Sequence, residues 1–66
     1  MQADELRDLR KALGLSQQEL ADTIGMSRKA ISEMERAAAP IERRTELSMR
    51  YLALQAEQGN PVRPAG

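Results

Sequence analysis

The spacing of leucines at the start of the chain predicts its first helix. Leu6, Leu9 and Leu13 lie three and four positions apart, and most of the residues around them are charged. On a helix this spacing brings the three side chains onto one face, which can pack against other elements. Gly14 follows at once and is suited to the left-handed conformation that ends many helices. We expect a helix over residues 4–13.

The second helix is predicted by its capping residues. Ser16 is followed three positions later by Glu19, which is the spacing of a capping box, where each side chain accepts a hydrogen bond from the backbone of the other residue. The helix should cover residues 17–24 and end at Gly25. Its apolar residues are Leu20, Ala21 and Ile24.

Two further helices are predicted from the next cap and from a proline. Ser27 is a good N-cap only two residues after Gly25, so the turn is very tight, and the third helix should run to about residue 36. Pro40 disfavours helical geometry in the residue before it and suits the first turn of a new helix. The fourth helix should therefore cover about residues 41–58.

The segment after the fourth helix has a different composition. The sequence "GNPVRPAG" has two prolines, two glycines and almost nothing to bury, so residues 59–66 should form a flexible tail. No strand-like alternation of apolar and polar residues occurs in the chain, and 66 residues make one domain at most. We expect an all-α bundle of four or five helices over residues 1–58.

The third predicted helix has two contrasting faces. Its apolar residues Ala30, Ile31 and Met34 fall on one side. The opposite side is polar and carries Arg28, Lys29, Ser32, Glu33 and Arg36. Two helices joined by a tight turn, the second of which presents long polar side chains, can place that second helix in the roughly 12 Å wide major groove of DNA. This arrangement would explain the two adjacent cations at the start of the helix.

Charge modifies this interpretation without removing it. The chain has 10 basic and 10 acidic side chains, and zero net charge argues against a strong nucleic-acid binder. The distribution is uneven, however. Residues 1–26 carry three basic and five acidic side chains, whereas residues 27–50 carry six basic and four acidic ones. The positive charge therefore lies in the middle of the chain.

Composition excludes several classes of protein. The sequence has no Cys and no His, which removes disulfides and the usual zinc sites, so we expect no metal and no cofactor. It has no phosphate-binding glycine loop and no nucleophile beside a base, so we expect no enzyme. No apolar run approaches the roughly 18 residues that span a bilayer, and the start "MQADELRDLR" is unlike a signal peptide. We expect a soluble, cytoplasmic protein without a membrane partner.

The segment "LRKALGLSQQELADTIGMSRKAISEMER" resembles the helix-turn-helix of bacterial regulators of the phage repressor, Cro and xenobiotic-response-element type. Gln17 opens the motif, Ala21 is the small residue four positions on, Gly25 lies in the turn and Ile31 is the branched residue of the recognition helix. The resemblance covers roughly residues 6–54. It implies a lambda-repressor-like fold and double-stranded DNA as the partner.

The resemblance also implies roles for individual residues. Gln17 would bond a phosphate, and Ser27 would cap the recognition helix or touch the DNA backbone. Base edges would be read from the polar face of that helix, and arginines beside it would contact phosphates. The expected DNA-binding set is Gln17, Ser27, Arg28, Lys29, Ser32, Glu33, Arg36, Arg43 and Arg44.

Structural alternatives exist for part of this set. Lys29 and Glu33 are four residues apart and could form a solvated pair on the helix surface. Arg43 and Arg44 could be plain surface charges, because "AAAPIERR" departs from the glycine- and lysine-rich loop that the family often has after the recognition helix.

The fourth predicted helix carries two apolar stripes. One consists of Leu47, Tyr51 and Leu54. The other consists of Ile41, Thr45, Ser48, Met49, Leu52 and Ala56. One stripe should complete the core, and the other should be covered by a second copy of the chain. Small residues allow close approach of helices, so we expect the second stripe to form the interface of a homodimer. Alternatively, both stripes are core and the protein is a monomer.

These observations predict a dimeric repressor of its own operon that binds a palindromic operator. We expect no small-molecule effector, because the chain leaves no room for an effector domain. Family members of this size include Cro-like phage repressors, antitoxins, restriction-modification controllers and anti-CRISPR-associated autorepressors. The alternative is a protein-interaction module that uses the same helical fold without binding DNA.

Overall fold

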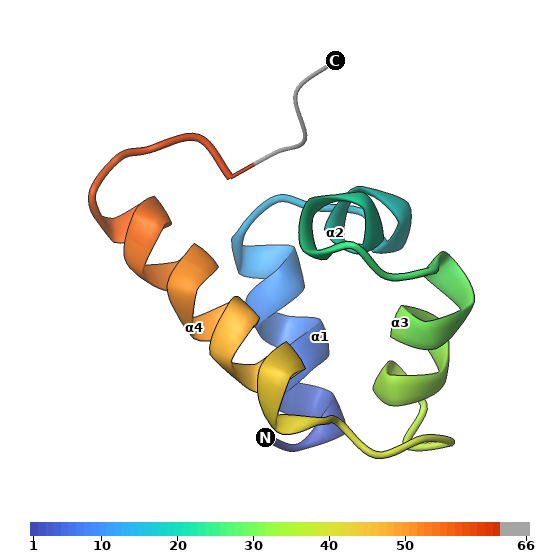
Figure 1. The fold of residues 1–66 in the computed structure, drawn as a ribbon. Helices are drawn as coiled ribbons and strands as arrows, with labels where there is room; N and C mark the ends of the chain where they lie inside the picture. The colour runs from blue at the N-terminus through green and yellow to red at the C-terminus, as the bar shows by residue number, and fades with distance from the viewer. Residues whose placement is uncertain (63–66) are drawn as a thin grey trace.

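Four helices joined by short connections make up the computed structural model, which describes residues 1–62 (Figure 1). They are α1 (Ala3–Ala12), α2 (Gln17–Ile24), α3 (Arg28–Glu35) and α4 (Arg43–Glu57). The described residues contain no strand, which confirms the predicted all-α bundle. Within the same residues, no helix has the length and apolar character needed to cross a membrane.

Local capping sets where α2 and α3 begin, as predicted. The Ser16 hydroxyl accepts a hydrogen bond from the Glu19 N–H at 3.0 Å, and the Ser16 N–H donates to the Glu19 carboxylate at 2.9 Å. The Ser27 hydroxyl accepts from the Ala30 N–H at 3.1 Å. Both serines thus satisfy backbone donors that the first turn of a helix leaves free.

The end of α3 differs from the other helix ends in its residue type. Gly25 ends α2 with φ +73°, a left-handed conformation that glycine adopts without strain. Ala37 takes the same conformation after α3, with φ +58°. The Ala38 N–H then donates to the Glu33 carbonyl at 2.8 Å, which completes the usual capping motif. The chain therefore makes this turn with a residue that the left-handed region disfavours.

The core lies between α1 and the other three helices. Figure 1 shows α3 and α4 on opposite sides of α1, which packs against both, while α2 packs against α3. The buried apolar residues are Leu6, Leu15, Leu20, Ala21, Ile31, Met34, Met49 and Leu52. Leu15 was not predicted as core, because it belongs to the connection between α1 and α2. Leu9 and Leu13, which were expected on a packing face, and Ile24, an apolar residue of the second predicted helix, lie half-buried at its edge.

Helix α4 turns the opposite face to the core from the one we expected. Thr45, Met49 and Leu52 are 1%, 0% and 6% exposed, whereas Leu47, Tyr51 and Leu54 are 53%, 61% and 49% exposed. The predicted dimer interface is therefore wrong in its main members, because their side chains fill the interior of their own subunit.

The remaining members of that predicted interface are less deeply buried. Ile41 is half-buried against the core, Ser48 is half-buried, and Ala56 is exposed near the end of α4. Because Ile41 packs in this way, the chain stays extended through Glu42, with ψ 154°, and α4 begins at Arg43, two residues later than predicted.

One residue of the described part of the predicted tail packs against the core, whereas residues 59–61 are exposed. Val62 is half-buried against the core cluster, where the sequence predicted a flexible segment. The rest of that tail, residues 63–66, lies outside the described residues.

Candidate nucleic-acid interface

The side of α3 that points away from the core presents the predicted recognition residues together. Ile31 and Met34 on the inner side are 0% and 3% exposed. The outer side carries Arg28 and Lys29, which are exposed, and Ser32 and Glu33, which are half-exposed; Arg36 follows directly and is exposed. The fold therefore gives α3 one face for packing and one face that is available to a partner.

The charges of α3 oppose its helix dipole. Arg28 and Lys29 occupy the first turn, which has no acidic residue, and the last turn has no basic residue. Helix α1 shows the favourable arrangement, with acids in its first turn and bases in its last. Cations near the positive end of a helix dipole are unfavourable by about 0.3–1 kcal/mol each. Among residues 1–62 no side chain compensates these two charges, as the ion pairs show.

The ion pairs in the described part of the chain do not include the cations at the start of α3. Neither Arg28 nor Lys29 takes part in a salt bridge or a side-chain hydrogen bond there. In particular, Lys29 does not pair with Glu33, so the solvated surface pair considered from the sequence is not formed. These cations lower the stability of the isolated fold and are free to meet a negatively charged partner.

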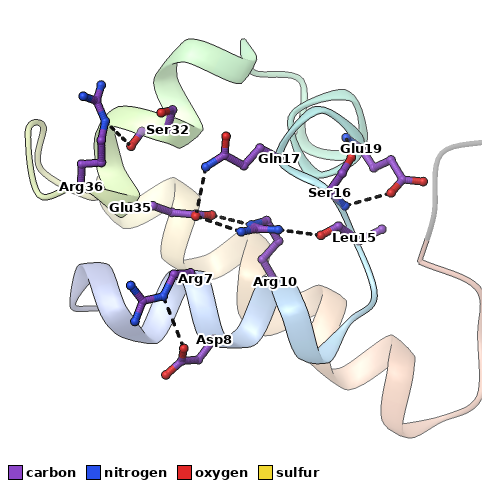
Figure 2. Close-up of polar contacts among 10 residues, drawn as sticks. All are labelled: Arg7, Asp8, Arg10, Leu15, Ser16, Gln17, Glu19, Ser32, Glu35 and Arg36. Carbon is purple, nitrogen blue, oxygen red and sulfur yellow. Dashed lines mark hydrogen bonds and ion pairs between the residues drawn. The ribbon is translucent and has the colours of Figure 1, made fainter.

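A buried polar network fixes α3 against α1 and α2 (Figure 2). The Arg10 guanidinium donates to the Glu35 carboxylate through Nε at 2.6 Å and through Nη2 at 3.1 Å. The Gln17 amide donates to the same carboxylate at 3.2 Å, and Arg10 Nη1 donates to the Leu15 carbonyl at 2.9 Å. This network links the first turn of α2 to the end of α3, and so sets the orientation of the exposed face.

The carboxyl of Glu35 titrates abnormally because of this network. Burial raises its pKa, but the hydrogen bonds from Arg10 and Gln17 and the positive charge of Arg10 outweigh burial, so the pKa lies below its ordinary value. Glu35 is therefore ionised at neutral pH.

Glu35 and Arg10 were missed from the sequence, although a signal was present. Glu35 lies four residues after Ile31, and Arg10 lies four residues after Leu6. Each charged residue therefore lies on the buried face of its own helix. Two opposite charges at core positions of neighbouring helices are typical of a buried ion pair.

The amide of Gln17, predicted to bond a phosphate, faces inward in part. One of its N–H groups bonds Glu35, and the side chain is half-buried. A glutamine amide has a second N–H group, which remains available at the start of α2.

The other predicted phosphate contacts are exposed on the surface. Arg36 donates from Nε to the Ser32 carbonyl at 3.4 Å. Arg44 pairs with Glu42 at 3.4 Å, whereas Arg43 makes no ion pair with any described residue. Among residues 1–62 no cluster of acidic side chains has a geometry that could hold a metal ion.

Comparison with known proteins gives one family. The family described as helix-turn-helix matches residues 6–45, which are 40 of the 66 residues and include most of α1 and all of α2 and α3. Neither the curated proteins nor the solved structures compared with the chain gave a match. The predicted resemblance is thereby confirmed. With its two capped helices, the tight turn at Gly25 and the exposed polar face of α3, the chain belongs to the helix-turn-helix family of DNA-binding regulators of the phage repressor, Cro and xenobiotic-response-element type.

Proposed function

We propose that the chain is a sequence-specific repressor that binds a palindromic operator as a homodimer and controls its own operon. The observation that carries this proposal is the pair of exposed cations, Arg28 and Lys29, in the first turn of α3. They are unfavourable for the isolated helix and have no counter-charge in the described chain. DNA supplies the missing negative partner through phosphates and through the acceptor atoms of guanine.

Individual roles follow from side-chain chemistry and exposure. Arg28 and Lys29 are suited to the O6 and N7 acceptors of guanine, and Glu33 is suited to the amino group of cytosine. Ser32 lies between them on the same face and can bond either a base or a phosphate. Phosphates flanking the groove would be met by Ser27, by the free N–H of Gln17, by Arg36 and by the arginines that begin α4.

A dimer follows from the exposed apolar residues of α4 and from the geometry of operators. Leu47, Tyr51 and Leu54 are exposed large apolar residues, and all three belong to α4. Figure 1 shows this helix on the opposite side of α1 from α3. Half-sites one turn apart are separated by about 34 Å, so each recognition helix must lie about 17 Å from the two-fold axis. The molecule measures 32 × 23 × 18 Å, so a dimer formed through α4 can place α3 at that distance.

Repression is the outcome that a small dimer produces by occupying a promoter. Binding to a palindrome depends on dimer concentration, so the regulator can respond to its own abundance without an effector. The rival proposal, a protein-interaction module, would need an acidic protein surface as the partner of these cations, and it gives no role to the match with the helix-turn-helix family.

Selection of bound duplexes from a random DNA pool tests the proposal. We expect the chain to enrich one palindromic motif with half-sites about one helical turn apart. A reporter gene whose promoter contains that motif should lose expression when the chain is produced, and should keep it when the motif is scrambled. Enrichment of no motif would overturn the proposal in favour of the interaction module, and enrichment of a single asymmetric half-site would overturn the dimer.

A further inference from the structure

The exposed face of α4 has the spacing of a helix-pairing seam. Leu47, Tyr51 and Leu54 are four and three residues apart, and Arg44 and Gln58 extend the same spacing at the two ends. This alternation of three and four residues keeps one line of side chains facing a second helix. We call Leu47, Tyr51 and Leu54 the outer stripe. It lies directly opposite the residues of α4 that fill the core.

The outer stripe continues into a groove beside α2. This groove has a volume of about 530 Å³ and is lined by Thr23, Ile24, Leu47, Ser48, Tyr51 and Leu52. A helix of 15 residues is only about 22 Å long, and a stable interface needs about 800 Å² on each partner. The groove therefore adds apolar surface that a pair of α4 helices needs.

A row of charges runs along one side of the outer stripe. Arg43, Arg50 and Glu57 follow one another at intervals of seven residues, so they share one flank of the helix. Arg50 is paired within the subunit, through Nη2, with Glu46 at 2.9 Å. Arg43 and Glu57 form no salt bridge with any other described residue. The flank thus has an unpaired cation at one end and an unpaired anion at the other.

We propose that the outer stripe binds the outer stripe of a second copy, with the two α4 helices antiparallel and Arg43 paired with Glu57 of the partner subunit. A two-fold axis near residue 50 places Leu47 opposite the partner's Leu54. The same axis places Arg43 opposite the partner's Glu57, because the midpoints of both pairs fall at or next to residue 50. Apolar packing and charge pairing therefore require the same register.

The charge row also selects the antiparallel orientation. In a parallel pair the two-fold axis would put the charged flanks of the two helices on opposite sides of the seam, so Arg43 could not reach Glu57 of the partner subunit, whereas an antiparallel pair brings the two flanks together. In the antiparallel pair only Arg50 meets its own copy near the axis, and Glu46 already neutralises it. This inference rests on the proposed function only for the existence of a dimer, and it specifies which surface and which ion pairs form that dimer.

Charge reversal tests the inference with variants that should fold well. Arg43→Glu places an acid at the start of α4 and Glu57→Arg places a base at its end, and both changes favour the helix dipole. A weaker dimer would therefore not result from a weaker helix. Each single reversal creates two repulsive contacts per dimer, and the double variant restores two attractive ones.

The dimer dissociation constant is measured by sedimentation equilibrium. The salt concentration is kept at about 50 mM, because surface charges are only weakly screened there. We expect each single variant to raise the dimer dissociation constant roughly 5- to 30-fold, which corresponds to about 0.5–1 kcal/mol at each of two contacts. The double variant should return to within about 3-fold of the parent. Lys11→Glu, the matched control with the same change of charge on α1, should leave the constant unchanged.

Any of three results would overturn the interface. One is a double variant that dimerises as weakly as the single variants, and another is single variants that dimerise as well as the parent. A parent that stays monomeric at about 100 µM would overturn it as well. Rescue in the double variant combined with failure to enrich any DNA motif would support the interface and refute the repressor. Enrichment of a palindrome without rescue would refute this interface alone.

Discussion

Ala37 shows how a single backbone conformation affects the stability of the recognition helix. Gly14, Gly25 and Gly59 adopt the left-handed conformation after α1, α2 and α4, and Ala37 adopts it after α3. A non-glycine residue in the left-handed conformation destabilises the fold by about 1–2 kcal/mol. Replacing it with glycine would recover only about half of this free energy, because glycine has more conformational freedom in the unfolded chain.

Replacing Ala37 with Gly should therefore stabilise the protein. We expect Ala37→Gly to raise the free energy of unfolding by about 0.5–1 kcal/mol, measured by urea denaturation at a fixed protein concentration. The neighbouring change Ala38→Gly is the control and should lower the free energy slightly, because Ala38 has no positive φ to relieve. An Ala37→Gly variant that is no more stable than the parent would show that the turn is not strained.

Arg28 shows a conflict between stability and the proposed function at one position. Arg28→Glu replaces a cation by an anion in the first turn of α3, where the helix dipole favours negative charge. We expect the free energy of unfolding to rise by about 0.3–1 kcal/mol while affinity for the selected DNA falls at least 10-fold. Both quantities can be measured on one preparation, by urea denaturation and by fluorescence anisotropy.

The control for Arg28→Glu is the same reversal at the other end of a helix. Lys11→Glu introduces an anion in the last turn of α1, so it should lower the free energy of unfolding and leave the DNA motif unchanged. Destabilisation by Arg28→Glu would mean that the arginine contributes to the fold in a way that the structure does not explain.

Among the elements, the Arg10, Gln17 and Glu35 network joins three helices through one carboxylate. Because its hydrogen bonds hold the pKa of Glu35 below the ordinary value of 4.5, the ionised carboxylate stabilises the fold above that pH. This contribution is lost as the pH falls through the lowered pKa of the folded state.

Glu35→Gln should remove this pH-dependent contribution. We expect the variant to be about 3 kcal/mol less stable than the parent at pH 7, because Arg10 then lacks its counter-charge. The difference should narrow as the pH falls from 4.5 through the lowered pKa of the folded state, where the parent also loses the ionised carboxylate. Thermal or urea unfolding from pH 7 to pH 3 measures it, with the exposed Asp8→Asn as a control that stays within about 0.5 kcal/mol of the parent. A difference that does not depend on pH would contradict this role of Glu35.

How well each element could be predicted depends on how local its determinants are. The starts of α2 and α3 were predicted correctly because Ser16 and Ser27 cap them through hydrogen bonds only three residues long. The face of α4 that enters the core was predicted wrongly. Both stripes are apolar, and the choice between them is made by packing against α1, which the sequence of α4 does not contain.

The residues of the candidate DNA interface could likewise be predicted only where their determinants are local. The exposed face of α3 follows from the helical repeat of Ile31 and Met34, so its polar residues could be found from the sequence. The bond between Gln17 and Glu35 could not, because it joins residues 18 positions apart through a tertiary contact.

At the scale of the whole molecule, zero net charge limits the electrostatic part of DNA binding. Only a few cations in each subunit are exposed on the proposed DNA-binding side, so affinity should fall less steeply with salt than for a strongly basic regulator. Replacing Arg36 or Arg44 with Ala should flatten the salt slope by about 1.8, because each contact is lost twice in a dimer. Lys11→Ala, measured by the same titration, should leave the slope unchanged. If Arg36→Ala or Arg44→Ala leaves the salt slope unchanged, that arginine is a solvated surface residue and makes no phosphate contact.

The central claim, that the outer face of α3 reads a DNA sequence, is tested most directly by comparing the motifs that the parent and Arg28→Ala select from one random pool. Circular dichroism first establishes that the variant is folded. The account predicts that Arg28→Ala loses the preference at one base pair in each half-site and binds the parent's site with about 1–3 kcal/mol less free energy, while Lys11→Ala selects the parent's motif. If the folded Arg28→Ala variant selects the same motif as the parent, with the same preference at every base pair, α3 does not read the DNA through this residue and the account is contradicted.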